Sequence, residues 1–192
     1  NGIVGLLATG GSTNHTIHLI AMARAAGVLI DWDDFSELSH VVPLLARVYP
    51  NGEADVNRFA AAGGTQFVFR ELIDAGLMHG DITTVVPGGM RAFCDEPRLT
   101  DGKLDYVPGV AKSADEAVVR PVSDAFDPQG GLRLLRGNLG RSLMKISAVK
   151  SEYHIIEAPA VVIDDPRALN KLHAAGVLPQ DFIAVVRYQG PR

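Results

Sequence analysis

The hydrophobic period changes along this chain, and the change limits the folds that the chain can adopt. Up to about residue 80, apolar residues recur at helical spacings, and glycines stand where such helices would end. Residues 81–130 are rich in Pro, Gly and Asp and show no clear period. From Gly131 the period shifts toward two, as in half-buried strands. The sequence therefore predicts a mixed α/β fold, mostly helical at first and β-rich later.

The same change in period suggests a domain organisation. We expect residues 1–110 to form the helical part of an N-terminal α/β domain and residues 111–130 to form a linker or crossing. Residues 131–192 are expected to begin a C-terminal β-barrel-like domain with one helix. Asp165 and Gly176 mark the start and the end of that helix, in "DDPRALNKLHAAG".

Capping residues predict where the first helices begin. The candidate caps are Ser12 or Thr13 for a helix that ends at Gly27, Asp33 or Asp34 for a short helix, and Ser39 for a third one. Ile17 and Ile20 are expected on the buried face of the first of these helices. Residues 3–80 should then be mostly helical.

Composition and charge exclude several classes of protein. The net charge is −4 and no basic stripe is present, so we expect no nucleic-acid partner. No run reaches the roughly 18 apolar residues of a membrane span, so we expect no membrane partner. The one cysteine, Cys94, excludes an internal disulfide framework and a multi-cysteine metal site built from this chain alone. A cytoplasmic location fits this cysteine count.

The two ends of the sequence have the character of an interior piece. The chain starts at Asn1 without methionine and stops just after an apolar, strand-like run. We expect a piece of a longer protein, and a processed whole protein is the alternative.

The string "GGSTN", residues 10–14, is the first candidate site. Glycines let a ligand approach the backbone closely, and free N–H groups at a helix N-terminus bind anions. Ser12, Thr13 and Asn14 add hydroxyl and amide groups suited to a carboxylate, a phosphate or a polyol. A plain helix cap explains the same residues, and the string alone leaves both interpretations open.

The loop "GNLGR", residues 137–141, is a second and weaker candidate. It could present Asn138, Arg141 and the nearby Lys145 to an anionic ligand. A β-turn with a solvated basic edge is the interpretation that the residues alone favour.

Histidine and cysteine residues suggest little further chemistry. His15 and His18 share a helix face, but a zinc site needs three or four ligands, so we expect packing or hydrogen-bonding roles. Cys94 has no base near it in the sequence, so we expect an inert thiol. These residues predict no catalytic group and no metal site in this chain.

Several strings taken together resemble the dihydroxy-acid dehydratase/phosphogluconate dehydratase family. They are "LATGGSTNHTIHLIAMARAAG", "IDWDDFSELS", "LARVYPNGEADVNRFAAAGG", "RELIDAGLMHGD", "GGLRLLRGNLGRSLMKISAV", "IIEAPAVVIDD" and "VVRYQGP". The likeness covers the whole chain. The strings "STNHT", "YPNG" and "GNLGR" resemble the branch that acts on 6-phosphogluconate.

The resemblance implies an enzyme that removes water from 6-phospho-D-gluconate to give 2-dehydro-3-deoxy-6-phosphogluconate. It also implies a [4Fe–4S] cluster, whose iron acts on the departing hydroxyl, and a homodimer of the complete enzyme. Ser12, Thr13, Asn14, Asn138 and Arg141 are the residues of this chain that we expect to bind substrate.

The sequence lacks the family's cluster cysteines and the motif that supplies its proposed serine base. We therefore expect no catalytic residue, no bound cluster and no dehydratase activity in this piece alone. The alternatives are a dehydratase for dihydroxy acids or another sugar acid, a non-catalytic sugar-acid binding module, and a purely structural lobe.

Overall fold

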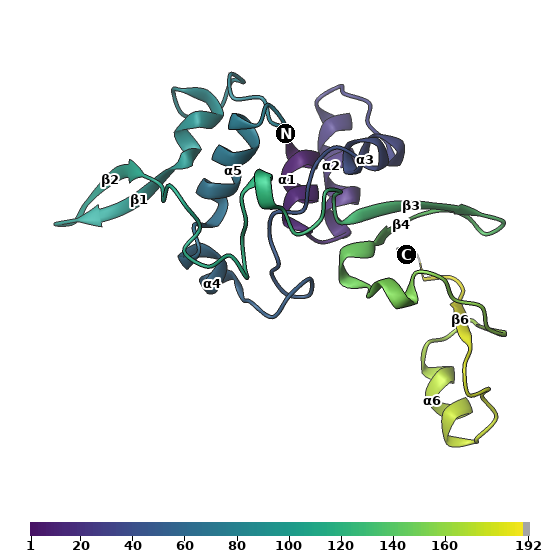
Figure 1. Cartoon of the computed structure of the whole chain (residues 1–192). Coiled ribbons are helices and arrows are strands. Elements are labelled where there is room, and N and C mark those ends of the chain that lie inside the picture. Colours follow the sequence, from purple (N-terminus) through teal and green to yellow (C-terminus); the bar gives the residue numbers. More distant parts are fainter. Residues whose placement is uncertain (190–192) are drawn as a thin grey trace. The chain divides into compact units, whose positions relative to one another are not determined.

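A computed structural model describes residues 1–189 of the chain (Figure 1). Its contacts divide the chain into two compact units, Asn1–Lys150 and Ser151–Arg192. The end of the string "VVRYQGP" lies outside the described residues.

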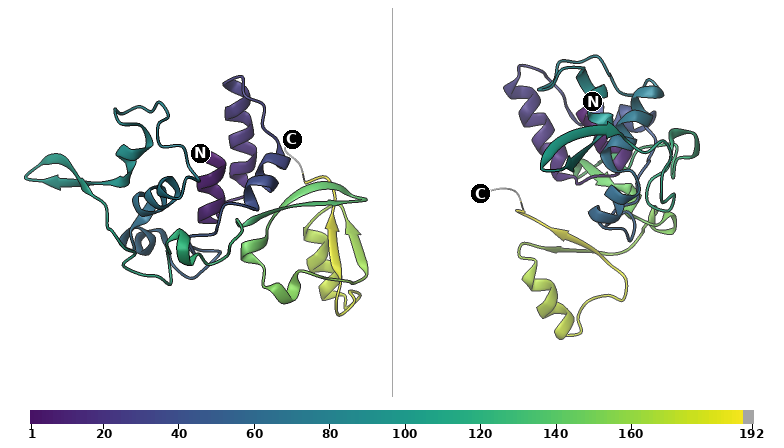
Figure 2. Two further views of the ribbon diagram at one scale, coloured as in Figure 1. Left: turned by 45° about the horizontal axis from the view of Figure 1, so that its top comes forward. Right: turned by 90° about the vertical axis from the view of Figure 1, so that its left-hand side faces the viewer.

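The first unit combines five α-helices with two β-hairpins. Its helices are α1 (Gly2–Thr9), α2 (Asn14–Ala25), α3 (Trp32–Ser39), α4 (Val56–Ala61) and α5 (Gly64–Asp74), with 3₁₀ turns η1 (Gly89–Cys94), η2 (Val122–Asp124) and η3 (Ile146–Ala148). Its strands are β1 (Asp95–Thr100), β2 (Lys103–Pro108), β3 (Leu132–Gly137) and β4 (Gly140–Lys145). The β1–β2 hairpin extends away from the helices in both Figure 1 and Figure 2.

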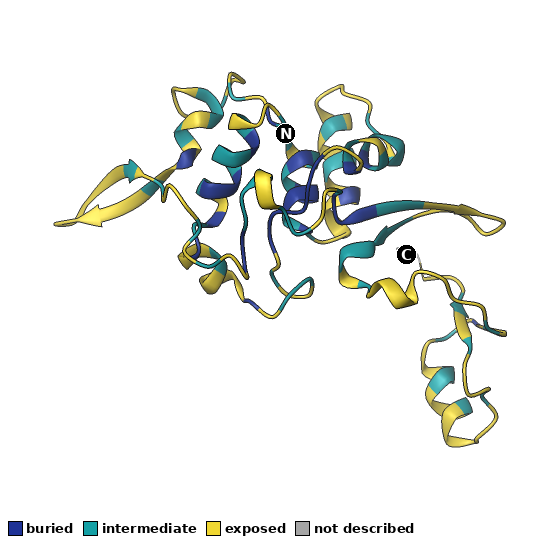
Figure 3. Cartoon of the chain, in the orientation of Figure 1, coloured by how far each residue is buried: buried dark blue, intermediate teal, exposed yellow. Residues whose placement is uncertain are grey.

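Helix α1 lies at the centre of the first unit and packs against α2, α3 and α5. Leu7 of α1, Phe35 of α3, and Phe67 and Leu72 of α5 are almost fully buried. Leu132 brings the start of β3 into the same cluster. Figure 3 shows the buried residues gathered in these elements, whereas the β1–β2 hairpin is exposed.

The segment of residues 42–48 is extended, so the helix predicted from Ser39 is wrong. Ser39 is the last residue of α3, and its buried hydroxyl donates hydrogen bonds to the carbonyls of Gly130 and Leu132. Residues 42–46 are all buried, and Leu45 donates its N–H to Ala8 and accepts that of Arg120. A short run that is buried on every side has no helical period, which explains the error.

Helix α2 forms where the capping pattern predicts it. Thr13 is its N-cap, and Gly27 follows it with a φ of 77°. The predicted buried face is wrong in part, because Ile17 is 64% exposed and the one fully buried residue of α2 is Thr16. For α3 the cap is Asp31, two residues before the expected Asp33, so the short helix starts earlier than predicted.

The described part of the second unit is a βαβ arrangement. It contains η4 (Ser151–Tyr153), β5 (Ala160–Ile163), α6 (Arg167–Ala174) and β6 (Ile183–Val186). Strands β5 and β6 pair in parallel, and α6 lies between them in the sequence as the crossover. Asp165 accepts the N–H of Arg167, and Gly176 has a φ of 66°, which confirms the helix predicted there.

The observed class is mixed α/β, as predicted. Within residues 1–189 the named strands form three separate two-stranded sheets and no closed barrel. The barrel-like domain and the boundaries at residues 110 and 131 therefore stay predictions. No helix in the described range is both long and apolar enough to cross a membrane.

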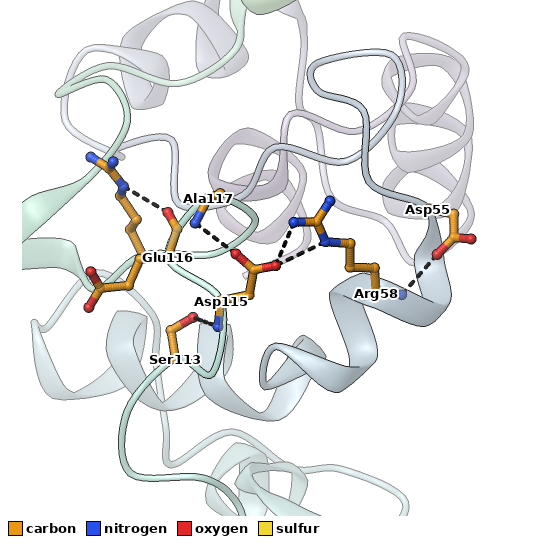
Figure 4. A network of polar contacts seen from close by, with 7 residues as sticks. Asp55, Arg58, Ser113, Asp115, Glu116 and Ala117 are labelled. Atoms are coloured by element: carbon orange, nitrogen blue, oxygen red, sulfur yellow. Dashed lines mark hydrogen bonds and ion pairs between the residues drawn. The ribbon is translucent and has the colours of Figure 1, made fainter.

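A polar network holds the start of α4 against residues 113–117 (Figure 4). The Arg58 guanidinium donates to one carboxylate oxygen of Asp115 from Nε at 2.9 Å and Nη2 at 2.8 Å. The other oxygen of Asp115 accepts the N–H of Ala117, and Asp55 caps α4 by accepting the N–H of Arg58. The Arg58 hydrogen bond holds the pKa of Asp115 below its usual range.

This network predicts a pH-dependent contribution to stability. Because the pKa of Asp115 is lowered in the folded chain, its contribution is complete above the ordinary aspartate pKa of about 4 and is lost as pH falls through the lowered value. Asp115→Asn should therefore lower the urea midpoint at pH 7, and the difference should vanish in acid. Asp101→Asn, in the exposed β1–β2 turn, is the control. A difference that does not change with pH would contradict this account.

Candidate functional site

A cavity of about 520 Å³ opens where α1 ends and α2 begins. It lies wholly in the first unit and is lined by Thr9, Gly10, Gly11, Ser12, Thr13, Val48, Tyr49, Pro50, Val56, Phe59, Thr65 and Lys145. The structure thus places "GGST" in a concave surface. This cavity is the candidate functional site, which we call the α1–α2 cavity.

Backbone geometry fixes the turn at the edge of this cavity. Gly10 ends α1 with a φ of 59°, a left-handed conformation that favours glycine. Its carbonyl accepts a 2.6 Å hydrogen bond from Nδ2 of Asn51. The N–H of Gly11 bonds back to the carbonyl of Leu6. The turn is therefore held from α1 and from the residue 49–52 loop.

Ser12 and Thr13, which follow Gly11 in the turn, have hydrogen-bond donors that the described part of the protein does not use. Among the described residues, the backbone N–H groups of Ser12 and Thr13 have no protein acceptor. The Ser12 hydroxyl accepts the N–H of Asn14 at 3.2 Å, and no bond of the Thr13 hydroxyl is found in that part of the chain. These groups stand at the N-terminus of the 12-residue α2, where the helix dipole favours a negative charge. The turn can therefore donate to an anion.

Lys145 adds a positive charge to the same cavity. It is the last residue of β4 and is half-buried, and this burial lowers the pKa of its ammonium group. Within residues 1–189 the ammonium group makes no ion pair or hydrogen bond with the protein. No Asp or Glu is among the described residues that line the cavity. An anionic ligand would thus meet a cation without a competing carboxylate.

The other predicted site residues lie elsewhere. Asn14 is exposed on α2 and does not line the cavity. Asn138 is exposed in the β3–β4 turn, and Arg141 lies four residues before Lys145, about 13 Å along the strand. Arg141 is bonded to Asp33 of α3 at 2.6 Å. The structure therefore brings Ser12 and Thr13 together with Lys145 in one cavity, whose described lining does not include Asn14, Asn138 or Arg141.

Asp33 pairs with both arginines near the tip of the β3–β4 hairpin. Its two carboxylate oxygens accept from Arg136 and Arg141, one on each strand of the β3–β4 hairpin. The pair joins α3 to the hairpin, which also packs against α3. One carboxylate thereby engages both arginines and offsets part of their positive charge.

Asn51 is a site residue that the sequence does not reveal. Its side chain donates to Gly10 and accepts the hydroxyl of Ser147 at 2.9 Å, so it connects the turn with the segment after β4. The sequence indicates it only as part of the turn in "YPNG". The one available signal is an amide beside a glycine-rich loop, and that signal does not identify a partner 41 residues away.

The residues of this chain do not fit an iron–sulfur cluster. Such clusters are held by several cysteine thiolates, and this sequence has one cysteine. Cys94 is 8% exposed, and burial raises the pKa of its thiol, which disfavours the thiolate. His15 and His18 are exposed on α2, and no group of three or more metal-ligating side chains is found in the described range.

Comparisons with known proteins match the whole length of the chain. Residues 1–92 match the family model described as dihydroxy-acid/6-phosphogluconate dehydratase N-terminal, and residues 117–192 match its C-terminal counterpart. The chain is 54% identical over 192 residues to phosphogluconate dehydratases of Pseudomonas aeruginosa and Escherichia coli, and 34% identical over 194 to a dihydroxy-acid dehydratase of Sulfurisphaera tokodaii.

All of this chain is covered in each of these alignments, but it spans only 32% of each relative's own length. Both family models describe parts of one family, and together they match most of the chain. The chain belongs to the dihydroxy-acid/6-phosphogluconate dehydratase family.

Proposed function

We propose that this chain is part of a phosphogluconate dehydratase. The enzyme would convert 6-phospho-D-gluconate to 2-dehydro-3-deoxy-6-phospho-D-gluconate and one water. The observation that carries the proposal is the level of identity across all 192 residues, 54% to two phosphogluconate dehydratases against 34% to a dihydroxy-acid dehydratase. A dihydroxy-acid or other sugar-acid dehydratase is the alternative within the family.

This chain would contribute a wall of the substrate site. Free N–H groups and hydroxyls at Ser12 and Thr13 suit a substrate that carries several hydroxyls and two acidic groups. Lys145 supplies the positive charge that such a substrate needs nearby. The chain's own residues would bind and orient the substrate.

Other parts of the proposal depend on the complete enzyme. A [4Fe–4S] cluster would have its ligands outside these residues, since one buried cysteine cannot hold it. The expected substrate contacts of Asn14, Asn138 and Arg141, the homodimer and the cytoplasmic location stay predictions.

Activity of the full-length protein tests the proposal. Anaerobically purified protein should produce the keto acid from 6-phosphogluconate with a kcat/KM at least about 100-fold above that for a branched dihydroxy acid, since a site built for polar groups rejects analogues that lack them. Equal or reversed preference would assign the chain to the other branch. Binding of the sugar acid without turnover, by full-length protein that takes up no cluster, would favour the binding module.

The turn at residues 12–14 gives a sharper test of the binding wall. In the full-length enzyme, Thr13→Val should raise the KM for 6-phosphogluconate by about 10-fold, because a hydrogen bond to a charged group is lost. Asn14→Ala is predicted to have a smaller effect, because Asn14 does not line the cavity. The control is Thr100→Val, on the exposed β1 strand. Unchanged kinetics in both turn variants would reduce the turn to a helix cap.

A further inference from the structure

We propose that Lys145, together with the backbone N–H groups of Ser12 and Thr13, forms a subsite for the terminal phosphate of the substrate. This inference rests on the proposed function, since it identifies which end of a phosphorylated sugar acid meets this wall. Its starting point is the grouping of three unsatisfied donors in the α1–α2 cavity.

The number of donors favours a phosphate over a carboxylate. A phosphate monoester has three terminal oxygens and a charge of about −1.5 to −2, whereas a carboxylate has two oxygens and one charge. The cavity offers two backbone N–H groups, the Thr13 hydroxyl and an ammonium group with three donors. Such a set exceeds what two carboxylate oxygens need and matches three phosphate oxygens.

The elements that hold these donors are fixed before a ligand arrives. Asn51 bonds both Gly10, just before the turn, and Ser147, two residues after Lys145. The turn and the end of β4 are thus tied through one side chain. A preorganised anion site loses little entropy on binding.

The remaining lining of the cavity, as far as the chain is described, contains no carboxylate that would repel an anion. Val48 and Phe59 are half-buried apolar walls that present no competing acceptor. Lys145 is half-buried, which lowers the pKa of its ammonium group, and an anionic partner would favour the charged form. The Arg58–Asp115 network holds α4, which carries Phe59, in place.

The test compares substrates with and without the phosphate in the full-length enzyme. Lys145→Met should raise the KM for 6-phosphogluconate about 10- to 100-fold and leave kcat within about threefold. The same variant should change kcat/KM for D-gluconate by less than about twofold. Lys145→Arg should recover part of the lost affinity because it keeps the charge. Lys112→Met, on an exposed loop, is the matched control.

Inorganic phosphate gives a readout that does not depend on turnover. It should bind the wild-type full-length protein in calorimetry and compete with 6-phosphogluconate, and Lys145→Met should weaken both effects about 10-fold or more. If the wild type binds phosphate through Lys145 but turns over no 6-phosphogluconate, the proposed function fails and the subsite stands. If turnover is normal and Lys145→Met changes neither KM nor phosphate binding, the subsite is overturned. An equal loss for D-gluconate also overturns it, since the site then holds the carboxylate.

A second pair of variants keeps the proposal testable if Lys145→Met does not fold. Thr13 has a φ of −60°, which proline adopts, so Thr13→Pro removes both the N–H and the hydroxyl. Thr13→Val removes the hydroxyl alone. Phosphate should bind Thr13→Pro at least about fivefold more weakly than Thr13→Val. Equal affinities would show that the Thr13 amide does not contact phosphate and would overturn the proposal.

Discussion

Gly10→Ala should lower the free energy of unfolding of the first unit by about 2–4 kcal/mol. The φ of 59° costs an alanine about 1–2 kcal/mol. A Cβ at Gly10 would also stand 1.9 Å from Nδ2 of Asn51, so the side chain that bonds the Gly10 carbonyl must move. The buried carbonyl then loses its donor, and the turn loses its connection to the segment after β4.

Urea unfolding monitored by Trp32 measures this effect, because Trp32 is the one tryptophan of the sequence and lies in the first unit. Gly27→Ala is the matched control. Gly27 has a φ of 77°, and a Cβ at this position would meet nothing within 4 Å, so the variant reports the backbone cost alone, about 1–2 kcal/mol. Equal losses in the two variants would contradict the role assigned to Asn51.

Phe67→Ala should cost more, about 3–5 kcal/mol, because it removes an aromatic ring from a close-packed core. Phe67 is 1% exposed on α5 and belongs to the cluster around α1. The same Trp32 measurement applies. Leu139→Ala is the control, since Leu139 is 85% exposed in the β3–β4 turn and should change stability by no more than about 0.5 kcal/mol. A loss below about 1 kcal/mol for Phe67→Ala would contradict the core assignment.

Local signals in the sequence are sufficient to predict several elements. The α2 helix begins at a predicted cap, Thr13, and α6 begins one residue later than predicted, with Pro166 as its N-cap; a glycine of positive φ follows each of them. The strands on either side of "GNLGR" pair as the β3–β4 hairpin, and "DFIAVVRY" contains β6. In each case, capping, glycine or turn residues within a few positions mark where the helix or strand ends, so the sequence can predict it without knowledge of distant contacts.

Elements that depend on distant partners are not predictable in this way. Residues 44–47 are extended because they pair with residues 118–127, which lie more than 70 positions later. Without that partner, the run resembles a helix as much as a strand. The buried pattern alone cannot choose between the two.

The candidate site, too, is only partly predictable from local signals. "GGSTN" is recognisable as a polar turn before a helix, which is a local property. Lys145 shares the cavity of this turn, whereas Arg141 is paired with Asp33, and both facts follow from how the hairpin packs against α3. The basic residues in the sequence therefore indicate an anion site. Only the three-dimensional arrangement shows that Lys145 is unpaired among the described residues of the cavity and that Arg141 is paired with Asp33.

Asn51 bonds two neighbours that lie far from it in the sequence, Gly10 at 41 positions and Ser147 at 96. An aspartate there would lack the amide donor, and a leucine would lack both functions. Changes in the shape of the turn and changes in the segment after β4 are consequently not independent. A lineage that drifts toward another ligand would have to alter both together, or retain this asparagine and vary the wall around it.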